Sequence, residues 1–305
     1  MVIPVFDERG TLEQLHGELT TVLNEVARDY ELIFIDDGSS DGSGELLLAL
    51  EDRDPHVRVF RFRANQGKAA GLNVGFAAAT GEIVITMDAD LQDRPAEVPR
   101  LIAALEGFDL VSGWKRIRHD PLGKTLPSRF FNWVTGKVSG VPLHDFNCGL
   151  KAYRREVVKE LDLYGEMHRF IPVLAAQRGF RSTEIPVEHA PRVWGKSKYG
   201  VSRLVKGAYD LLTVLLLTRF QTRPMHFFGT IGLSLGGVGT IILIYMSYLR
   251  LVAEEVIGNR PLLFLGMLLV IAGIQFLSVG LLGELVVRRT GRPLPELPLH
   301  RRRGA

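Results

Sequence analysis

Ile83-Val84-Ile85-Thr86-Met87-Asp88-Ala89-Asp90-Leu91-Gln92 is the stretch that decides the fold. Its first five residues are apolar or β-branched, which is typical of a buried strand, and two carboxylates separated by one residue follow directly. In open α/β sheets, ligands bind beyond the carboxyl ends of the strands. The sequence therefore predicts a strand at 83–88 that leads into a ligand-binding loop.

The residues before this stretch repeat the same arrangement. Short runs rich in β-branched residues predict further strands at 2–6, 31–36 and 57–61. The segments between the four strands have helical spacing, at 11–29, 42–51 and 67–79. Alternating strands and helices with right-handed crossovers form a mainly parallel sheet. We therefore predict a Rossmann-like α/β domain over residues 1–203, with polar loops gathered at one edge of the sheet.

Composition excludes several other classes of protein. The chain of 305 residues is 46% apolar with a formal net charge of +3, which argues against disorder and against a nucleic-acid partner. A single cysteine, Cys148, excludes an internal disulfide and suits a reducing compartment. Four of the eight histidines, at positions 119, 144, 168 and 189, have no zinc-ligand spacing with this cysteine. The first residues lack the basic start of a secretory signal, so we expect this domain to stay in the cytoplasm.

The composition of the chain changes after residue 203. Residues 204–222 mix leucines with charged side chains, which predicts an amphipathic helix in the membrane interface. Residues 227–249 and 261–283 contain no Asp, Glu, Lys or Arg, and each reaches the roughly 20 residues that a membrane span needs. We predict two transmembrane helices, at about 226–250 and 261–284, within a region 223–305 that ends in a basic tail.

Small and basic residues refine this picture. Arginines precede and follow the two spans, so the positive-inside rule puts both ends, and with them the first domain, on the cytoplasmic side of the inner membrane. Glu284, at the end of the second span, is expected to act as an interfacial cap rather than a proton relay. Several glycines of the first span are expected to permit close helix contact, namely Gly229, Gly232, Gly236, Gly237 and Gly239.

Asp88 and Asp90 are the first candidates for chemistry. Two carboxylates one residue apart at a strand end can share a hard cation, and Gln92 adds a neutral oxygen ligand. Such a cation would neutralise a diphosphate leaving group. Acidic pairs are also common in ordinary loops, so the pair alone does not establish a metal site.

Two further loops carry candidates. Asp36 and Asp37 begin a run of glycine and serine, whose capping function does not require two adjacent carboxylates, so we expect them to bind a base or ribose. Lys68 lies near the start of a predicted helix, where it would hold phosphate or orient the acidic loop. A solvated capping lysine is the alternative.

Taken together, these motifs resemble those of glycosyltransferase family 2 enzymes of GT-A fold, and within them the polyprenyl-phosphate glycosyltransferases related to dolichyl-phosphate mannose synthase. The matching elements occur in the family's order over most of the first domain, at residues 2–8, 36–43, 65–68, 88–93, 145–151 and 195–198. The ordered set is specific, whereas each member alone is not.

The resemblance implies roles for individual residues. It implies that Asp88, Asp90 and Gln92 hold Mg²⁺ or Mn²⁺ against the donor diphosphate, and that Lys115 and Arg129 bind the acceptor phosphate. Lysine at position 115 departs from the arginine common in relatives and gives up bidentate phosphate binding. The nucleotide is implied to be bordered by Pro4, Val5, Glu8, Asp37, Lys68 and Ala89, with Arg192, Lys196 and Lys198 in a loop closing over its phosphates.

The resemblance also implies a reaction. A monosaccharide would pass from a UDP- or GDP-sugar to a polyprenyl phosphate, with inversion, at the cytoplasmic membrane face. A lipid phosphate is already a charged nucleophile, so no strong base is needed. One alternative is a family 2 transferase that acts on a lipid or polysaccharide hydroxyl, although the Gln-x-x-Arg-Trp element of processive synthases is absent. The other is a non-catalytic, membrane-anchored nucleotide-sugar-binding subunit. Some relatives with two spans form homo-oligomers, which is an analogy only.

Overall fold

A computed structural model of the chain describes residues 1–26, 29–116, 131–137, 139–190, 224–254, 256 and 260–290. The chain divides into two compact units, residues 1–214 and 215–305, and each is considered by itself. The predicted amphipathic helix at 204–222, and the predicted boundary at residue 203, lie outside the described residues.

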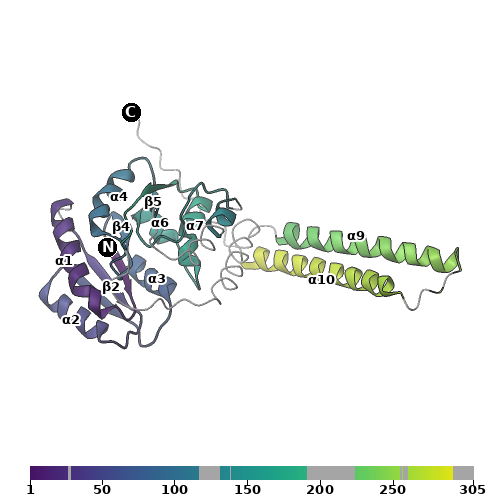
Figure 1. The fold of residues 1–305 in the computed structure, drawn as a ribbon, viewed down its shortest axis with the longest axis horizontal. Helices are drawn as coiled ribbons and strands as arrows, with labels where there is room; N and C mark the ends of the chain where they lie inside the picture. The colour runs from purple at the N-terminus through teal and green to yellow at the C-terminus, as the bar shows by residue number, and fades with distance from the viewer. Residues whose placement is uncertain are drawn as a thin grey trace. The chain divides into compact units, whose positions relative to one another are not determined.

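A sheet forms the centre of the first unit (Figure 1). It has seven strands in the order β3-β2-β1-β4-β6-β5-β7. β1 runs parallel to β2 and β4, β2 runs parallel to β3, and β5 runs parallel to β7. Only β6 runs antiparallel to its neighbours, β4 and β5. The strands are β1 (Val2–Val5), β2 (Leu32–Asp36), β3 (Val57–Arg61), β4 (Ile83–Thr86), β5 (Leu110–Trp114), β6 (Lys151–Arg154) and β7 (Ser182–Pro186). The predicted mainly parallel sheet is confirmed, while β5, β6 and β7 were not predicted.

The helices of the first unit follow the predicted alternation. The three predicted helices are present with ends shifted by a few residues, as α1 (Arg9–Val26), α2 (Ser43–Arg53) and α3 (Lys68–Ala78). Shorter helices follow, namely η1 (Pro95–Glu97), α4 (Val98–Ala104), α6 (Arg155–Glu160), η2 (Met167–Phe170) and α7 (Ile171–Gln177).

The two faces of β1 explain why helices pack on both sides of the sheet. Successive strand residues point to opposite faces, and Ile3 belongs to the same buried cluster as Leu12 and Leu15 of α1. Val2 faces α3 instead. A Cβ at Gly75 of α3 would lie 2.3 Å from Val2 Cγ1, so only glycine lets this helix approach so closely.

The second unit is a hairpin of two long helices, α9 (Pro224–Leu251) and α10 (Pro261–Thr290). Glycines bring the two backbones into contact: a Cβ at Gly232 would lie 2.7 Å from the carbonyl oxygen of Gly273, and one at Gly239 equally close to that of Gly266. The order of these pairs makes the helices antiparallel. A Cβ at Gly237 would meet open space, and one at Gly229 would meet Met225 of the same helix, so these two glycines do not face α10; Gly236 takes part through its backbone, which a Cβ at Gly273 would meet at 2.7 Å.

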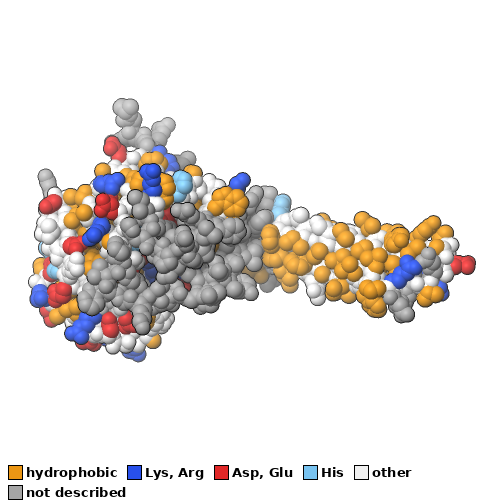
Figure 2. Space-filling model, in the orientation of Figure 1, with side chains coloured by type: hydrophobic (Ala, Val, Ile, Leu, Met, Phe, Trp, Pro, Cys, Tyr) orange, Lys and Arg blue, Asp and Glu red, His pale blue; other side chains and the backbone are white. Residues whose placement is uncertain are grey.

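The outer surface of the hairpin is apolar. Figure 2 shows hydrophobic side chains along both helices and charged ones at the connecting end. The most apolar 18-residue windows of Pro224–Leu251 and Pro261–Val287 have mean hydropathies of 1.9 and 2.5, so both helices are long and apolar enough to cross a membrane, as predicted. At the open end, the backbone N–H of Met225 donates to Glu284 Oε2 at 3.3 Å, so this carboxylate caps the start of α9, while its expected position at the membrane interface stays a prediction.

Candidate active site

Three neighbouring parallel strands, β2, β1 and β4, end at the same edge of the sheet. The loops after β1 and β2 are joined there. The backbone N–H of Asp7 donates to Ser39 Oγ at 3.0 Å, and that of Ser40 donates to Asp7 Oδ1 at 2.8 Å. Asp7 itself has a φ of +52°, a conformation that non-glycine residues seldom adopt. The edge is therefore a fixed, interlocked surface.

The acidic loop, residues 88–93, follows β4 at this edge. Thr11 Oγ1 donates to the carbonyl oxygen of Ala89 at 2.6 Å, which ties the middle of the Asp88-Ala89-Asp90 sequence to the start of α1. Leu91 is buried and has a φ of +58°, a strained conformation that its surroundings must hold in place. The two carboxylates predicted to bind metal thus flank an anchored residue.

Lys68 forms an ion pair with Asp88. Burial by itself would raise the pKa of Asp88, but Lys68, with smaller contributions from Lys115 and His168, outweighs it and lowers that pKa to about 2. A Cβ at Gly149 would lie 2.5 Å from Asp88 Oδ2, so glycine at this position leaves room for the carboxylate. Lys68 therefore contacts the acidic loop, one of the two functions predicted for it.

Asp37 holds the loop that carries Lys68. Its two carboxylate oxygens accept hydrogen bonds from the backbone N–H groups of Gln66, at 2.6 Å, and Gly67, at 3.0 Å. Gly67 has a φ of +88°, which favours glycine and lets α3 begin at Lys68. Burial raises the pKa of Asp37 in spite of these two donors. In this structure the Asp37 carboxylate stabilises the loop through these hydrogen bonds. Its contact with the nucleotide stays a prediction.

Lys115 lies inside the protein, with its Nζ 2.6 Å from Asp93 Oδ1. Burial would lower the pKa of Lys115, but Asp93 outweighs it and raises that pKa above the ordinary value. The ammonium predicted to bind the acceptor phosphate is thus already paired. The backbone of Asp93 also forms an isolated antiparallel β-bridge with that of His189. Next to it, the backbone N–H of Ala190 donates to the carbonyl oxygen of Gln92 at 2.9 Å. His189 and Ala190 therefore lie directly beside the acidic loop.

A small polar pocket opens beside Asp88. Its lining includes the polar side chains of Lys68, Asp88, Asn147, Lys151 and His168, those of Thr86 and Tyr153, and apolar residues such as Pro4 of β1. Lys151 is 3% exposed and donates from its Nζ to the carbonyl oxygens of Cys148 and, at 3.3 Å, Phe146. Burial lowers the pKa of Lys151.

His168 and Asn147 are the residues of this pocket that the sequence did not reveal. Within the described ranges, His168 Nδ1 and Asn147 Oδ1 are buried without a hydrogen-bond partner. Burial lowers the pKa of His168 well below its usual value, so the imidazole is neutral near pH 7. Sequence reasoning considered His168 only as a zinc ligand. Asn147 and Lys151 belong to the 145–151 motif, and that membership was the one signal for them.

Cys148 fits the expected small buried residue. A Cβ at Gly113 would lie 2.9 Å from its Sγ, and burial raises the pKa of the thiol to about 12. A thiol of this kind is not a nucleophile at neutral pH.

The remaining predicted residues divide into two groups. Val5 ends β1, while Glu8 and Asp90 belong to the loops at the same sheet edge, as does Gln92. The other predicted residues lie outside the described part of the chain, namely Arg129, Arg192, Lys196 and Lys198.

The donor set suits a hard cation that is shared with a ligand. Within the described residues, no three histidine, cysteine or carboxylate side chains are grouped closely enough to hold a metal by themselves. Two carboxylates and an amide leave most positions around Mg²⁺ or Mn²⁺ for water and for ligand oxygens. These residues therefore fit a cation that binds together with a diphosphate.

Comparison with known proteins identifies the family. Residues 1–162 match the model described as Glycosyl transferase family 2. The chain is 36% identical over 294 residues to the dodecaprenyl-phosphate galacturonate synthase of Rhizobium johnstonii, covering 94% of this chain and 87% of that protein. It is 37% identical to the undecaprenyl-phosphate 4-deoxy-4-formamido-L-arabinose transferase of Salmonella choleraesuis, covering 94% and 88%. The chain belongs to glycosyltransferase family 2.

Solved structures confirm the fold class. The glucosyl-3-phosphoglycerate synthase of Mycobacterium tuberculosis, in complex with Mn²⁺, uridine diphosphate and phosphoglyceric acid, matches with a TM-score of 0.55. The match covers 70% of this chain and 75% of that chain at 20% identity. The predicted GT-A fold is therefore confirmed.

Proposed function

We propose that this chain transfers a monosaccharide from a UDP- or GDP-sugar to a polyprenyl phosphate. One observation carries the proposal: the two relatives, whose names specify sugar transfer to a polyprenyl phosphate, align with 94% of the chain. The alignment therefore includes most of the apolar hairpin as well as the acidic loop, so both parts that such a reaction needs belong to the shared sequence.

The donor nucleotide binds at the carboxyl edge of β2, β1 and β4. Pro4, Val5, Glu8, Asp37 and Ala89 border it. The hydrogen bond from Ala190 to Gln92 supports a further element of the proposal, because it holds Ala190, two residues before Arg192 in the chain, beside the acidic loop. From there Arg192, Lys196 and Lys198 would reach the donor phosphates.

Asp88, Asp90 and Gln92 would hold Mg²⁺ or Mn²⁺. The cation supplies charge neutralisation to the departing nucleoside diphosphate. The chain's own contribution is to present ionised carboxylates in a fixed place. Lys68 keeps Asp88 ionised and oriented through their ion pair, and the Thr11 hydroxyl holds the backbone between the two carboxylates. Positioning of this kind is a major source of catalysis when two anions must meet.

The acceptor is a lipid monophosphate whose oxygen attacks the anomeric carbon directly. It is charged at neutral pH, so no general base is needed, and a single displacement inverts the configuration. Arg129 would orient the phosphate by two parallel hydrogen bonds. Lys115 would bind the phosphate in exchange for Asp93, because the ion pair with this carboxylate neutralises its charge.

The hairpin anchors the enzyme in the inner membrane with the catalytic unit on the cytoplasmic side. Its apolar surface and the basic residues before and after it support this arrangement. Self-association of the chain stays a prediction.

Purified full-length protein in detergent, supplied with Mn²⁺ or Mg²⁺ and a panel of radiolabelled UDP- and GDP-sugars, tests the proposal. We expect label to pass to undecaprenyl phosphate and not to undecaprenol, which has the same lipid with a hydroxyl in place of the phosphate. Transfer to undecaprenol would instead favour a hydroxyl-directed transferase. Nucleotide-sugar binding without transfer to either lipid would favour a non-catalytic subunit.

A further inference from the structure

The pocket beside Asp88 contains polar groups of two kinds. The cations are satisfied within the protein, since Lys68 pairs with Asp88 and Lys151 donates to two backbone carbonyl oxygens. The acceptors are not: among the described residues, neither His168 Nδ1 nor Asn147 Oδ1 has a hydrogen-bond partner, although both atoms are buried. Buried polar atoms without partners are uncommon in folded proteins, and two of them on residues that line one pocket call for an explanation.

Their surroundings make both atoms acceptors. The Asn147 amide nitrogen donates to Asn132 Oδ1 at 3.4 Å, which leaves its Oδ1 as the unpaired atom. The carboxylate of Glu166 lies 3.9 Å from His168 Nε2 and favours the proton on that nitrogen, so Nδ1 presents its lone pair. The missing partner must therefore donate hydrogen bonds, as a hydroxyl does. A carboxylate or a phosphate would instead meet two lone pairs.

The backbone around both residues is held in place. Met167 and Phe170, on either side in η2, are buried, and Arg169 forms an ion pair with Glu166 at 2.6 Å. Asn147 follows Asp145, whose Oδ1 accepts the backbone N–H of Asn147 at 3.1 Å. Side chains that cannot rotate away discriminate between ligands more sharply than mobile ones.

We propose that His168 and Asn147 are specificity-determining residues that accept hydrogen bonds from uncharged hydroxyl groups of the donor sugar. The inference deepens the proposed function and rests on it, because Asp88 in the same pocket is a ligand of the proposed diphosphate-bound cation. The sugar is attached to that diphosphate, so it lies within reach of the next polar groups in the wall.

Equilibrium binding to the full-length protein with Mn²⁺ tests the proposal, with UDP-glucose and GDP-mannose compared with UDP and GDP. We expect His168→Phe to weaken binding of the accepted nucleotide-sugar about tenfold, the typical cost of one lost hydrogen bond, and to leave binding of the free nucleotide unchanged. Asn147→Leu should behave in the same way. His168→Asn, whose amide oxygen can replace Nδ1, should restore most of the loss.

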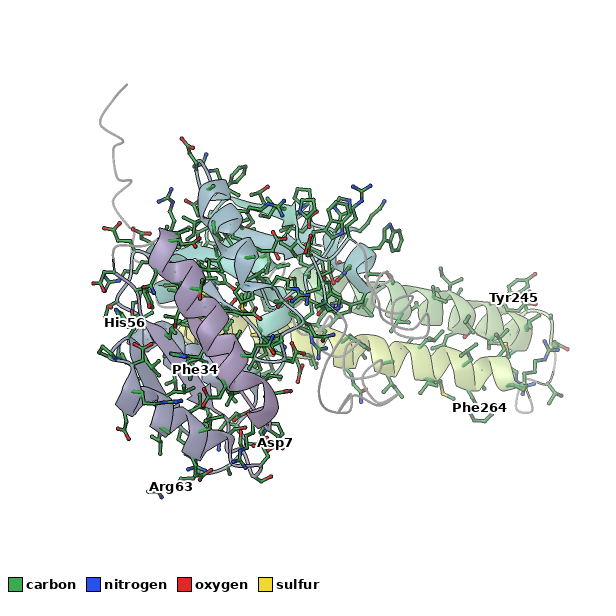
Figure 3. All side chains as sticks on the ribbon, turned by 60° about the vertical axis from the view of Figure 1, so that its left-hand side comes forward. Asp7, Phe34, His56, Arg63, Tyr245 and Phe264 are labelled. Carbon is green, nitrogen blue, oxygen red and sulfur yellow. The ribbon has the colours of Figure 1, made fainter. Side chains whose placement is uncertain are left out.

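His56→Phe is the matched control. Its ring stacks on Tyr30 at 4.3 Å, and it precedes β3, at the end of the strands opposite to Asp7 (Figure 3). This variant should bind sugar nucleotide and nucleotide as the wild type does.

Deoxyfluoro analogues of the accepted sugar supply the second measurement, because fluorine cannot donate a hydrogen bond. Wild type should discriminate against at least one analogue about tenfold, and His168→Phe should lose that discrimination. Equal loss of nucleotide and nucleotide-sugar binding, or unchanged discrimination in both variants, would overturn the inference while leaving the proposed function intact. If wild type binds no nucleotide-sugar at all, the proposed function and the inference fall together.

Discussion

The catalytic unit and the hairpin use the same residue types in opposite ways. Leu12 and Leu15 of α1 are fully buried, whereas Leu268 and Leu282 of α10 are each 62% exposed. In the hairpin it is glycine that faces the partner helix, at Gly232 and Gly273. Water drives large apolar side chains inward, while lipid gives no such drive and leaves close backbone contact to hold helices together. The two units of one chain are therefore stabilised differently, the first by burying large apolar side chains and the second by close contact between helix backbones.

The largest expected effect touches only the catalytic unit. Asp90→Asn removes one charge from the proposed cation site and should reduce transfer a hundredfold or more, on the order of the loss seen when a transition-state-stabilising group is removed. The far-ultraviolet circular dichroism should not change, because the amide keeps the shape of the carboxylate. Initial rates over a range of Mn²⁺ concentrations measure the effect. Wild-type activity in this variant would remove Asp90 from the cation site.

The second prediction concerns a substitution that destabilises the hairpin alone. A Cβ at Gly273 would lie 2.7 Å from the carbonyl oxygen of Gly232, so Gly273→Ala must push the backbones apart. We expect a loss of about 1–3 kcal/mol in the unfolding free energy of the hairpin, as for other overpacked contacts. Titration with sodium dodecyl sulfate, followed by circular dichroism, measures it. Gly237→Ala, at a position with open space, is the control and should be neutral. Equal effects of the two changes would contradict the glycine contact.

The third prediction is its counterpart in the catalytic unit. Gly75→Ala would place a Cβ 2.3 Å from Val2 Cγ1 and should destabilise this unit by about 1–3 kcal/mol. The chain's three tryptophans are Trp114, Trp133 and Trp194, so thermal unfolding followed by tryptophan fluorescence reports on residues of the first unit alone.

Gly17→Ala is the matched control for this change. Gly17 lies in α1 with nothing within 4 Å, so alanine there should stabilise the helix by up to about 1 kcal/mol. Stabilisation by both alanines would show that α3 has room for a side chain against β1.

The smallest expected effect is a dependence of folding stability on pH. The pKa of Asp88 falls from 3.8 to about 2 in the folded protein, chiefly because Lys68 outweighs burial. For a carboxyl group whose pKa is depressed on folding, the stabilisation is complete above the unfolded value and is lost as the pH falls through the folded one. Wild type should therefore lose stability between about pH 4 and pH 2. Lys68→Met should show a weaker dependence in the same tryptophan measurement, and an identical dependence would contradict the role of this ion pair.

The first four strands of the sheet could be predicted from the sequence, together with the site residues in the loops that directly follow them. The strands up to residue 86 are rich in apolar and β-branched residues and alternate with helices, so their pattern is strong. β6 escaped because it begins with Lys151, a buried lysine whose partners are backbone carbonyl oxygens, and β7 because Ser182, Thr183 and Glu184 are polar. Their places in the sheet depend on pairing across long stretches of chain, which no local pattern encodes.

The same reason explains which site residues were found. Asp88 and Lys68 follow strands or begin helices at positions where the topology itself predicts a ligand edge. His168 reaches the pocket through η2, more than 70 residues further along, and nothing in its neighbours distinguishes it from other histidines. Residues 145–151 were recognisable as a motif, yet the unpaired oxygen of Asn147 could only be seen once the chain was folded.

The hydrogen bond from Thr11 to Ala89 has a consequence for how the enzyme meets its substrate. Since α1 is packed into the core of the catalytic unit, the acidic segment cannot swing open or shut unless that helix moves too. Adaptation to an incoming donor is therefore left to rotation about side-chain bonds at Asp88 and Asp90. The acidic loop is therefore ordered when the protein folds, and it does not have to be ordered again in each catalytic cycle.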